Sequence, residues 1–317
     1  MQLLLLHLDD ALELQPDFMH SSMMAGAQEV SDKESGRSIR LWGRKQALDC
    51  LWRNLAKTAP LSAKGSRLCF MGSGDFHHVT ALLLQLALEG CSQPVTVIHI
   101  DNHPDWVHFD NGMHCGSWVN KALEQPLVKK VITLGVCSHD LRSPERKGAN
   151  LLPLADGRLE LYPYEHPPSR VKSSYGSGAS FSQVAGALHW QSISVLGESN
   201  FLDRLLSRIE TQAVYITIDK DVLSDADAVT NWDQGSMRLP YVLWLLSEIG
   251  ERHRVIGADV TGDYSAPSYG GDLYMRAMKK AEILIEQPYR RRDIASTRNI
   301  NSAANHALLE VLSELMP

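Results

Sequence analysis

The stretch Val95-Thr-Val-Ile-His-Ile-Asp-Asn-His-Pro-Asp105 joins a run of mostly apolar residues to a cluster of acidic and histidine side chains. Its β-branched residues, followed by the turn formers Asp, Asn and Pro, predict a buried strand over 95–100. A second run, Val214–Ile218, leads into Asp219-Lys-Asp221 in the same way. Strands that are apolar throughout are typical of a parallel sheet covered on both faces. In such sheets ligands bind at the carboxyl ends of the strands, which is where these polar clusters fall.

Apolar runs alternate with helical patterns along the whole chain. Strands are expected at 3–7, 68–72, 95–100, 131–136, 193–196, 214–218 and 255–258, and helices near 42–56, 78–89, 199–210, 240–251, 272–286 and 303–316. This order predicts a doubly wound, mostly parallel α/β sheet with helices on both faces, in a single domain over 1–317. Residues 143–184, rich in Pro, Gly and Ser, break the rhythm and are interpreted as a long loop excursion.

Composition excludes several classes of protein. The 317 residues carry a net charge of −6, so no general positive field favours nucleic acid or an anionic membrane. The apolar start, Met1–Leu6, lacks the basic region of a signal peptide, and no apolar run approaches the roughly 20 residues that span a bilayer. Five cysteines without a CxxC spacing favour a reducing, cytoplasmic compartment. The Arg290–Arg292 run is interpreted as a solvated or interface segment, and a homo-oligomer is compatible with the sequence.

The polar residues after the strands have the pattern of metal ligands. Side chains alternate along extended chain, so Asp101, His103 and Asp105 can converge on one side, as can Asp219 and Asp221. A histidine at 77 or 78 follows another strand and is expected at the same edge. A single Asp after a strand is usually a turn former or a helix N-cap. Four carboxylates packed together repel one another unless cations neutralise them, so the joint pattern predicts two divalent metal ions.

These motifs resemble those of the ureohydrolases, the family of arginase, agmatinase and formimidoylglutamase, and mark the chain as a divergent member. Phe76-His77-His78-Val-Thr80 is similar to the family's D-H-S-V-T, which favours His77 as the ligand. Asp101-Asn-His103-Pro-Asp105 matches D-A-H-x-D, and Thr217-Ile-Asp219-Lys-Asp221 matches S-x-D-x-D. Asn111-Gly-Met-His114-Cys-Gly116 resembles the family's glycine-flanked histidine loop.

The resemblance implies a fold, a cofactor and a reaction. The cofactor would be two Mn²⁺ ions, although other divalent metals suit the same oxygen and imidazole donors. The implied ligands are His77, Asp101, Asp105 and Asp219 for one ion and His103, Asp101, Asp219 and Asp221 for the other. Metal-bound hydroxide, oriented by Asp221, would attack a guanidino, formimino or amide C–N bond of a small molecule. His114 would pass a proton to the leaving amine.

The sequence departs from the family where the substrate would bind. Gly262, in Gly257-Ala-Asp-Val-Thr-Gly262-Asp263, stands in the place of the glutamate that binds the guanidinium group. A glycine offers no charge and is expected to leave room, with Asp263 as the substitute substrate-binding carboxylate. We therefore expect arginine and agmatine to be poor substrates unless Asp263 reaches the site.

Two other functions fit part of the pattern. A deacetylase-like, single-zinc amide hydrolase would use the His77–His78 pair for proton transfer, although Asp105 has no role in a one-metal site. A non-catalytic, metal-binding relative would explain the missing glutamate. Metal stoichiometry tests the first alternative, and turnover tests the second.

Overall fold

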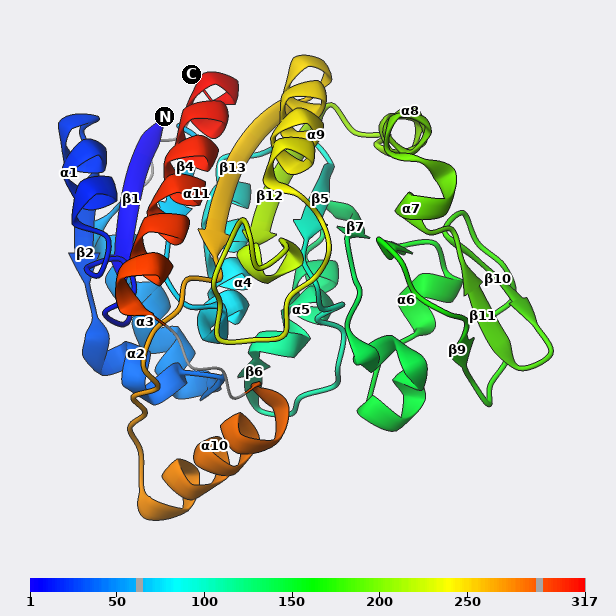
Figure 1. Cartoon of the computed structure of the whole chain (residues 1–317), viewed down its shortest axis with the longest axis horizontal. Helices are drawn as coiled ribbons and strands as arrows, with labels where there is room; N and C mark the ends of the chain where they lie inside the picture. Colours follow the sequence, from blue (N-terminus) through cyan, green and yellow to red (C-terminus); the bar gives the residue numbers. More distant parts are fainter. Residues whose placement is uncertain (61–64, 289–292, 317) are drawn as a thin grey trace.

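A parallel sheet of eight strands runs through the chain in a computed structural model that describes residues 1–60, 65–288 and 293–316. The strand order is β2-β1-β4-β13-β12-β5-β7-β8, and every neighbouring pair is parallel (Figure 1). The strands are β1 (Gln2–His7), β2 (Gln28–Ser31), β4 (Arg67–Phe70), β5 (Val95–Ile100), β7 (Val128–Leu134), β8 (Leu159–Tyr162), β12 (Ala213–Asp219) and β13 (Arg254–Thr261). The predicted doubly wound α/β fold is confirmed.

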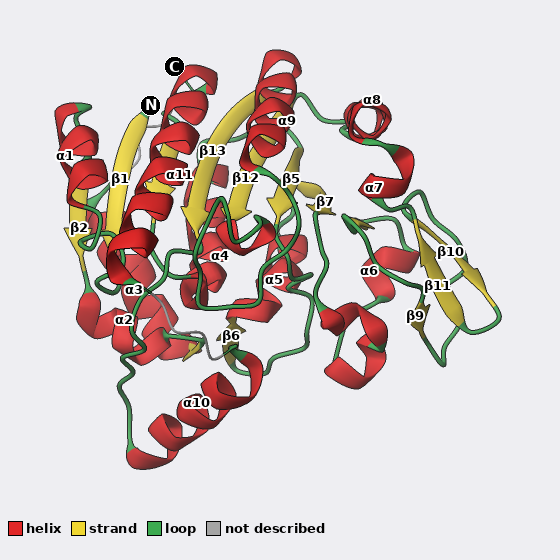
Figure 2. Ribbon diagram, viewed as in Figure 1, coloured by secondary structure: helices red, strands yellow, loops and turns green. Residues whose placement is uncertain are grey.

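Helices cover both faces of this sheet, as Figure 2 shows. They are α1 (Pro16–Met24), α2 (Lys33–Ile39), α3 (Lys45–Thr58), α4 (Thr80–Leu88), α5 (Trp118–Glu124), α6 (Leu152–Ala155), α7 (Ile193–Leu196), α8 (Glu198–Arg208), α9 (Leu239–Arg252), α10 (Leu273–Glu286) and α11 (Ile294–Leu315). Each of the six predicted helices overlaps one of these. The last begins earlier than predicted, at Ile294, where Asp293 caps it by accepting a hydrogen bond from the Ser296 amide. Within the described ranges, no helix is both long and apolar enough to cross a bilayer.

The core consists of two layers, one on each face of the sheet. Adjacent residues of one strand belong to different layers: Leu4 packs with the cluster that includes α3, α4 and α5, and Leu5 with the cluster that includes α1, α8, α9 and α11. This division follows from the two-residue period of a strand. Every residue of β5 and β12 is buried, which is why their sequences are apolar throughout.

The strand predicted at 193–196 is wrong. These residues form the short helix α7, in which Ile193 is buried and Val195 is 83% exposed, and Gly197 ends it at φ +81°. The apolar run was too short for its composition to distinguish a strand from a helical turn. Residues Gln28–Ser31 instead supply β2, an edge strand that the sequence pattern did not reveal.

The 143–184 segment is more ordered than a loop excursion. It contains α6 and β8, the edge strand next to β7. Glu160 hid this strand, because an acidic residue is not expected in a buried run. The Glu160 carboxylate is 2.7 Å from Lys130 Nζ and 2.6 Å from an Arg208 nitrogen, so its buried charge is paired.

Two small antiparallel sheets lie outside the central one. The strands β9 (Ser169–Arg170), β10 (Phe181–Val184) and β11 (Ala187–Trp190) form a sheet at one end of the molecule (Figure 1). The strands β3 (Trp42–Arg44) and β6 (Gly112–His114) pair near the pocket described below. The Arg290–Arg292 run lies outside the described residues.

Candidate metal centre and its pocket

The predicted ligands meet at the carboxyl ends of β4, β5 and β12. Strand β12 pairs directly with β5, which brings Asp219 close to Asp101. Asp221 follows in the short 3₁₀ helix η5 (Lys220–Val222), and His77 lies in another, η1 (Gly74–Val79), after β4. All four side chains are buried. The carboxyl ends of neighbouring parallel strands are the usual ligand site of an open α/β sheet.

One group of possible ligands surrounds His77. Its Nδ1 atom is 3.0 Å from Asp101 Oδ2, 3.0 Å from Asp105 Oδ2 and 3.7 Å from Asp219 Oδ2. His99 also belongs to this group, with Nε2 2.8 Å from Asp101 Oδ2. Ligand atoms of His77, His99, Asp101 and Asp105 all lie within 4.8 Å of one another, so one ion could contact several of them.

A second group lies beside the first and shares Asp101 with it. His103 Nδ1 is 2.9 Å from Asp221 Oδ2 and 3.6 Å from Asp101 Oδ1. The Asn102 amide donates to Asp221 Oδ1 over 3.1 Å, which fixes the orientation of that carboxylate. Two adjoining groups with a common aspartate form an arrangement that can hold two metal ions.

The charges of the cluster's own side chains are out of balance. Burial and the charge of Asp101 raise the pKa of Asp219 to about 7, and burial and Asp219 raise the pKa of Asp221 well above its ordinary value. Burial by itself lowers the pKa of His77, but Asp101 and Asp105 outweigh it, so that pKa is raised. The carboxylates repel one another and cannot all ionise together, and the imidazole beside them is drawn toward protonation. A bound cation would remove this repulsion.

His77 provides the test of whether a metal fits. Its Nδ1 atom is buried and has no hydrogen-bond partner among the described residues, although it faces three carboxylates. An unsatisfied nitrogen in that position costs free energy unless an ion binds it. The donors are carboxylate oxygens and imidazole nitrogens, which suit a hard or borderline divalent cation.

Hydrogen bonds behind the cluster fix the histidine rings. His77 Nε2 is 2.9 Å from Thr217 Oγ1, and Thr217 donates to the buried Asp259 over 2.8 Å. His103 Nε2 is 2.9 Å from Asp233 Oδ1. Partners of this kind orient the imidazole of a metal ligand and set its tautomer. Asp75, two residues before His77 in the sequence, bonds to other partners.

Asp75 belongs instead to a separate buried ion pair. Its Oδ2 atom accepts from Arg40 Nε over 2.6 Å, and its Oδ1 atom accepts from Trp232 Nε1 over 2.9 Å and from Gln287 Nε2 over 2.7 Å. Arg40 is fully buried. The ion pair therefore ties the turn after β4 to the residue that follows α2, and the Gln287 hydrogen bond ties the same turn to the chain that follows α10.

The backbone is constrained next to two of the acids. Asp105 adopts φ +49°, unusual for a residue with a side chain, and its Oδ2 atom accepts from Trp118 Nε1 over 2.6 Å. Gly74 lies so close to Asp219 that a Cβ atom there would be 2.6 Å from Oδ2. Strained or tightly packed backbone of this kind is common at functional sites, where the surroundings hold it in place.

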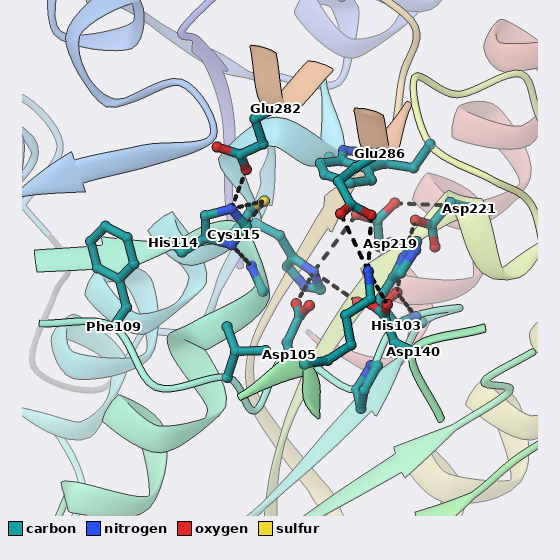
Figure 3. A pocket seen from close by; sticks show the side chains of 18 residues that line it. His103, Asp105, Phe109, His114, Cys115, Asp140, Asp219, Asp221, Glu282 and Glu286 are labelled. Atoms are coloured by element: carbon teal, nitrogen blue, oxygen red, sulfur yellow. Dashed lines mark hydrogen bonds and ion pairs between the residues drawn. The ribbon is translucent and has the colours of Figure 1, made fainter. Parts of the chain in front are cut away.

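A pocket of about 300 Å³ opens above the cluster (Figure 3). The predicted ligands form its floor, and Pro104, Val107, Phe109 and Trp232 line its sides. The remaining polar residues of the wall are His114, Asp140, Lys147, Glu282 and Glu286.

His114 lines this pocket, as predicted, and both its ring nitrogens are engaged. Nδ1 accepts a hydrogen bond from the Gly116 amide over 2.8 Å, so the ring proton of the neutral form lies on Nε2. Nε2 faces Glu282 Oε1 at 2.5 Å. Burial and the charge of Glu282 raise the pKa of the adjacent Cys115 thiol well above its ordinary value, which makes a thiolate nucleophile there unfavourable.

The structure does not bring the predicted substrate-binding residue to the pocket. Asp263 is 1% exposed, pairs with Lys220 and accepts from Asn305, which leaves it no free oxygen facing a substrate. Gly262 does not leave room either. It adopts φ +94°, and a Cβ atom there would overlap Asp219 Oδ1 and lie 2.5 Å from the Lys220 amide nitrogen. Because Asp263 does not reach the pocket, the expectation that arginine and agmatine are poor substrates stays a prediction.

Three features of the site escaped the sequence analysis. His99 lies two residues before Asp101, so the same two-residue period that grouped Asp101 with His103 predicts it on the same side. Asp233 lies in an irregular segment that carries no pattern. Glu282 and Glu286 are spaced one helical turn apart, but only the tertiary fold shows that they face the pocket.

Comparison with known proteins gives a match to the sequence model of one family and matches to several solved structures. The sequence model of the Arginase family matches residues 39–152. An uncharacterized protein of Thermotoga maritima is 25% identical over 194 residues, which cover 61% of this chain and 57% of that protein. The chain thus matches little more than half the length of that relative.

The solved structures similar to this chain agree in their fold. The proclavaminate amidino hydrolase of Streptomyces clavuligerus has a TM-score of 0.57 at 15% identity, covering 98% of this chain and 91% of its own. The arginase of Bacillus caldovelox has a TM-score of 0.57 at 13% identity, with 97% of both chains covered. The formimidoylglutamase of Bacillus subtilis has a TM-score of 0.57 at 12% identity, covering 100% of this chain and 87% of its own. At these identities the likeness establishes the fold, and the chemistry must be argued from the site.

Proposed function

We propose that this chain, a divergent member of the arginase (ureohydrolase) family, is a hydrolase that cleaves a guanidino, formimino or amide C–N bond with two bound Mn²⁺ ions. We place it in the cytoplasm, with a small molecule as its substrate. The observation that carries the proposal is the pair of ligand groups joined by Asp101, with the buried His77 Nδ1 directed at three carboxylates.

The donor set supports two ions rather than one. Asp101 presents Oδ2 to the His77 group and Oδ1 to His103, so it can bridge two cations. Asp219 lies 3.7 Å from His77 Nδ1 and lines the pocket, where it could contact both. Four aspartates carry four negative charges, and two divalent ions would balance them.

The residues around the cluster have distinct proposed roles. When bound, the ions would lower the pKa of a water molecule toward neutrality and polarise the carbon to be attacked. Asp221, held by the Asn102 amide, would orient that water. His114 would take up and release the proton that the leaving amine requires.

Metal content tests this proposal directly. Protein stripped with a chelator and then supplied with Mn²⁺ should bind two ions per chain by elemental analysis. Asp219→Asn should lose metal, because it removes an anion that both ions need. The matched control is Asp203→Asn, on the exposed surface of α8, which should retain both ions. One ion per wild-type chain, or full occupancy in Asp219→Asn, would contradict the proposal.

Activity should then be sought by following urea, ammonia or amine release from guanidino, formimino and amide compounds. A two-metal protein without turnover on any of them would favour the non-catalytic alternative.

The deacetylase-like alternative gains no support from His78. Its ring is buried, does not line the pocket, and burial lowers its pKa, so it is poorly placed to transfer protons there.

A further inference from the structure

Helix α10 contributes Glu282 and Glu286 to the lining of the pocket and leaves several of its large apolar side chains exposed. Among its residues only Lys279 is buried, whereas Leu273, Tyr274 and Ile285 are 82%, 71% and 77% exposed. A surface helix normally turns its apolar side chains toward the core. The side chains of α10 that are not exposed are Met275, Ile283 and three charged ones, Lys279, Glu282 and Glu286. The contacts of these three charged side chains lie at or next to the pocket.

These three charged side chains fix the helix beside the pocket. Lys279 donates to the Ser38 carbonyl over 2.8 Å, and its Nζ atom lies 4.6 Å from the ring centre of Trp42. Glu282 contacts His114, and Glu286 is 3.2 Å from Lys147 Nζ. Glu282 and Glu286 are one turn apart, and Figure 3 shows both pointing from α10 toward the cluster.

These glutamates set the charge of the pocket once the metal ligands are balanced. Two divalent ions, when bound, would neutralise the four aspartates of the floor. The other charged lining residues are Asp140, Glu282 and Glu286 against Lys147, which leaves a net charge of −2 with histidine neutral. Lys147 is already paired, 3.3 Å from Asp140 and 3.2 Å from Glu286. The wall opposite the metal centre is therefore anionic, with no free cation among the described residues that line it.

The same pocket has the other properties of a ligand site. Its volume of about 300 Å³ is enough for a small organic molecule. The proposed metal ligands line one part of the pocket, and the scissile bond of a substrate would bind there. Phe109 and Trp232 also line the pocket, and aromatic faces attract cations. A substrate bound at the floor would extend toward Glu286.

Building on the proposed function, we propose that Glu282 and Glu286 are specificity-determining residues. They select a substrate whose end remote from the scissile C–N bond is a protonated amine, and they disfavour one that ends in a carboxylate. The pair between Lys147 and Glu286 is partly exposed, at 37% and 33%, and such pairs contribute little stability. A substrate ammonium group can displace Lys147 from Glu286 at small cost, while Lys147 keeps Asp140 as its partner.

Two matched series of compounds test this proposal. The guanidino series is 4-guanidinobutylamine, butylguanidine and 4-guanidinobutanoate, and the amide series is N-acetylputrescine, N-butylacetamide and 4-acetamidobutanoate. Members of a series differ only in the remote end. Affinity is measured by calorimetry on the Mn²⁺-loaded protein, and KM wherever turnover occurs. In at least one series the amine should bind about ten-fold tighter than the neutral compound, and the carboxylate weakest.

Variants assign the preference to α10. Glu286→Gln should remove most of the preference for the amine while leaving metal content and binding of the neutral compound unchanged. Glu282→Gln should weaken it as well. Glu310→Gln, at an exposed position of α11, is the matched control and should keep the full preference.

The outcomes separate this inference from the proposed reaction. A preference for the amine in binding, without turnover in either series or on a formimino compound, would support the inference and contradict the proposed function. Equal affinity across both series, or no binding at all, would overturn the inference. A ten-fold preference that survives in both Glu286→Gln and Glu282→Gln would also overturn it, because the selectivity would then arise elsewhere.

Discussion

Replacing Gly262 tests whether the proposed metal site depends on a residue that is not itself a metal ligand. In Gly262→Ala the φ of +94° would strain the new side chain by about 1–2 kcal/mol. The added methyl group would also overlap Asp219 Oδ1 and the Lys220 amide nitrogen, and crowding of this kind costs about 1–3 kcal/mol. The free energy of unfolding should therefore fall by about 2–5 kcal/mol, and the displaced Asp219 should bind metal poorly.

The assay is urea denaturation of the metal-free protein, followed by Mn²⁺ titration with elemental analysis. Gly26→Ala is the matched control, because Gly26 has φ +84° but no atom within 4 Å of the added methyl group. It should lose about 1–2 kcal/mol through strain and keep both ions. The reasoning is refuted if Gly262→Ala loses no more stability than Gly26→Ala and still binds two ions. By the same argument Gly262→Glu should damage the centre rather than create a guanidinium site.

Three further predictions concern other parts of the site. His114→Ala should keep its metal but turn over about 10²–10⁴-fold more slowly, and an unchanged rate would return His114 to a structural role. His99→Leu should lower Mn²⁺ affinity about 10–100-fold without abolishing either site, as measured by competition with a chelator; undiminished affinity would show that its 2.8 Å contact with Asp101 is dispensable. Burial lowers the pKa of Lys279 to about 8, so between about pH 8 and 10 the unfolded chain binds more protons than the folded chain, and stability should rise with pH. Lys279→Met should lose that rise in urea denaturation at about pH 7.5 and 9.5, and an equal slope in both proteins would contradict it.

The floor of the site was predictable because its pattern is local. In Val95–Ile100 and Val214–Ile218, burial on both faces makes the strands apolar, and the acids that follow stand out against them. Because those strands are neighbours in the sheet, residues far apart in sequence meet at one edge. His99 was missed only because it lies inside the strand, where a histidine is more often a satisfied polar residue.

The wall of the site was not predictable in the same way. Glu282 and Glu286 come from a helix that follows the last strand of the sheet, and nothing in their neighbourhood distinguishes a pocket-facing turn from a solvated one. The expectations that Gly262 leaves room in the pocket and that Asp263 binds the substrate failed for a related reason. Matching it to a glutamate by position assumes the same backbone path, whereas here the chain turns through a positive φ against Asp219 and directs Asp263 to Lys220.

Because Glu282 and Glu286 come from α10, the residues proposed to select the substrate lie on a different element from the residues proposed to hold the metal. Asp101 directly follows β5 and Asp219 ends β12, and both strands pack into both core layers, so changes around these aspartates threaten the fold together with the metal centre. Helix α10 contributes almost nothing to those layers, and substitutions at 282 and 286 should cost little stability. Mutation can thus vary the wall while selection preserves the floor. Descendants of such a chain can acquire new substrates one residue at a time without passing through an unfolded or metal-free ancestor.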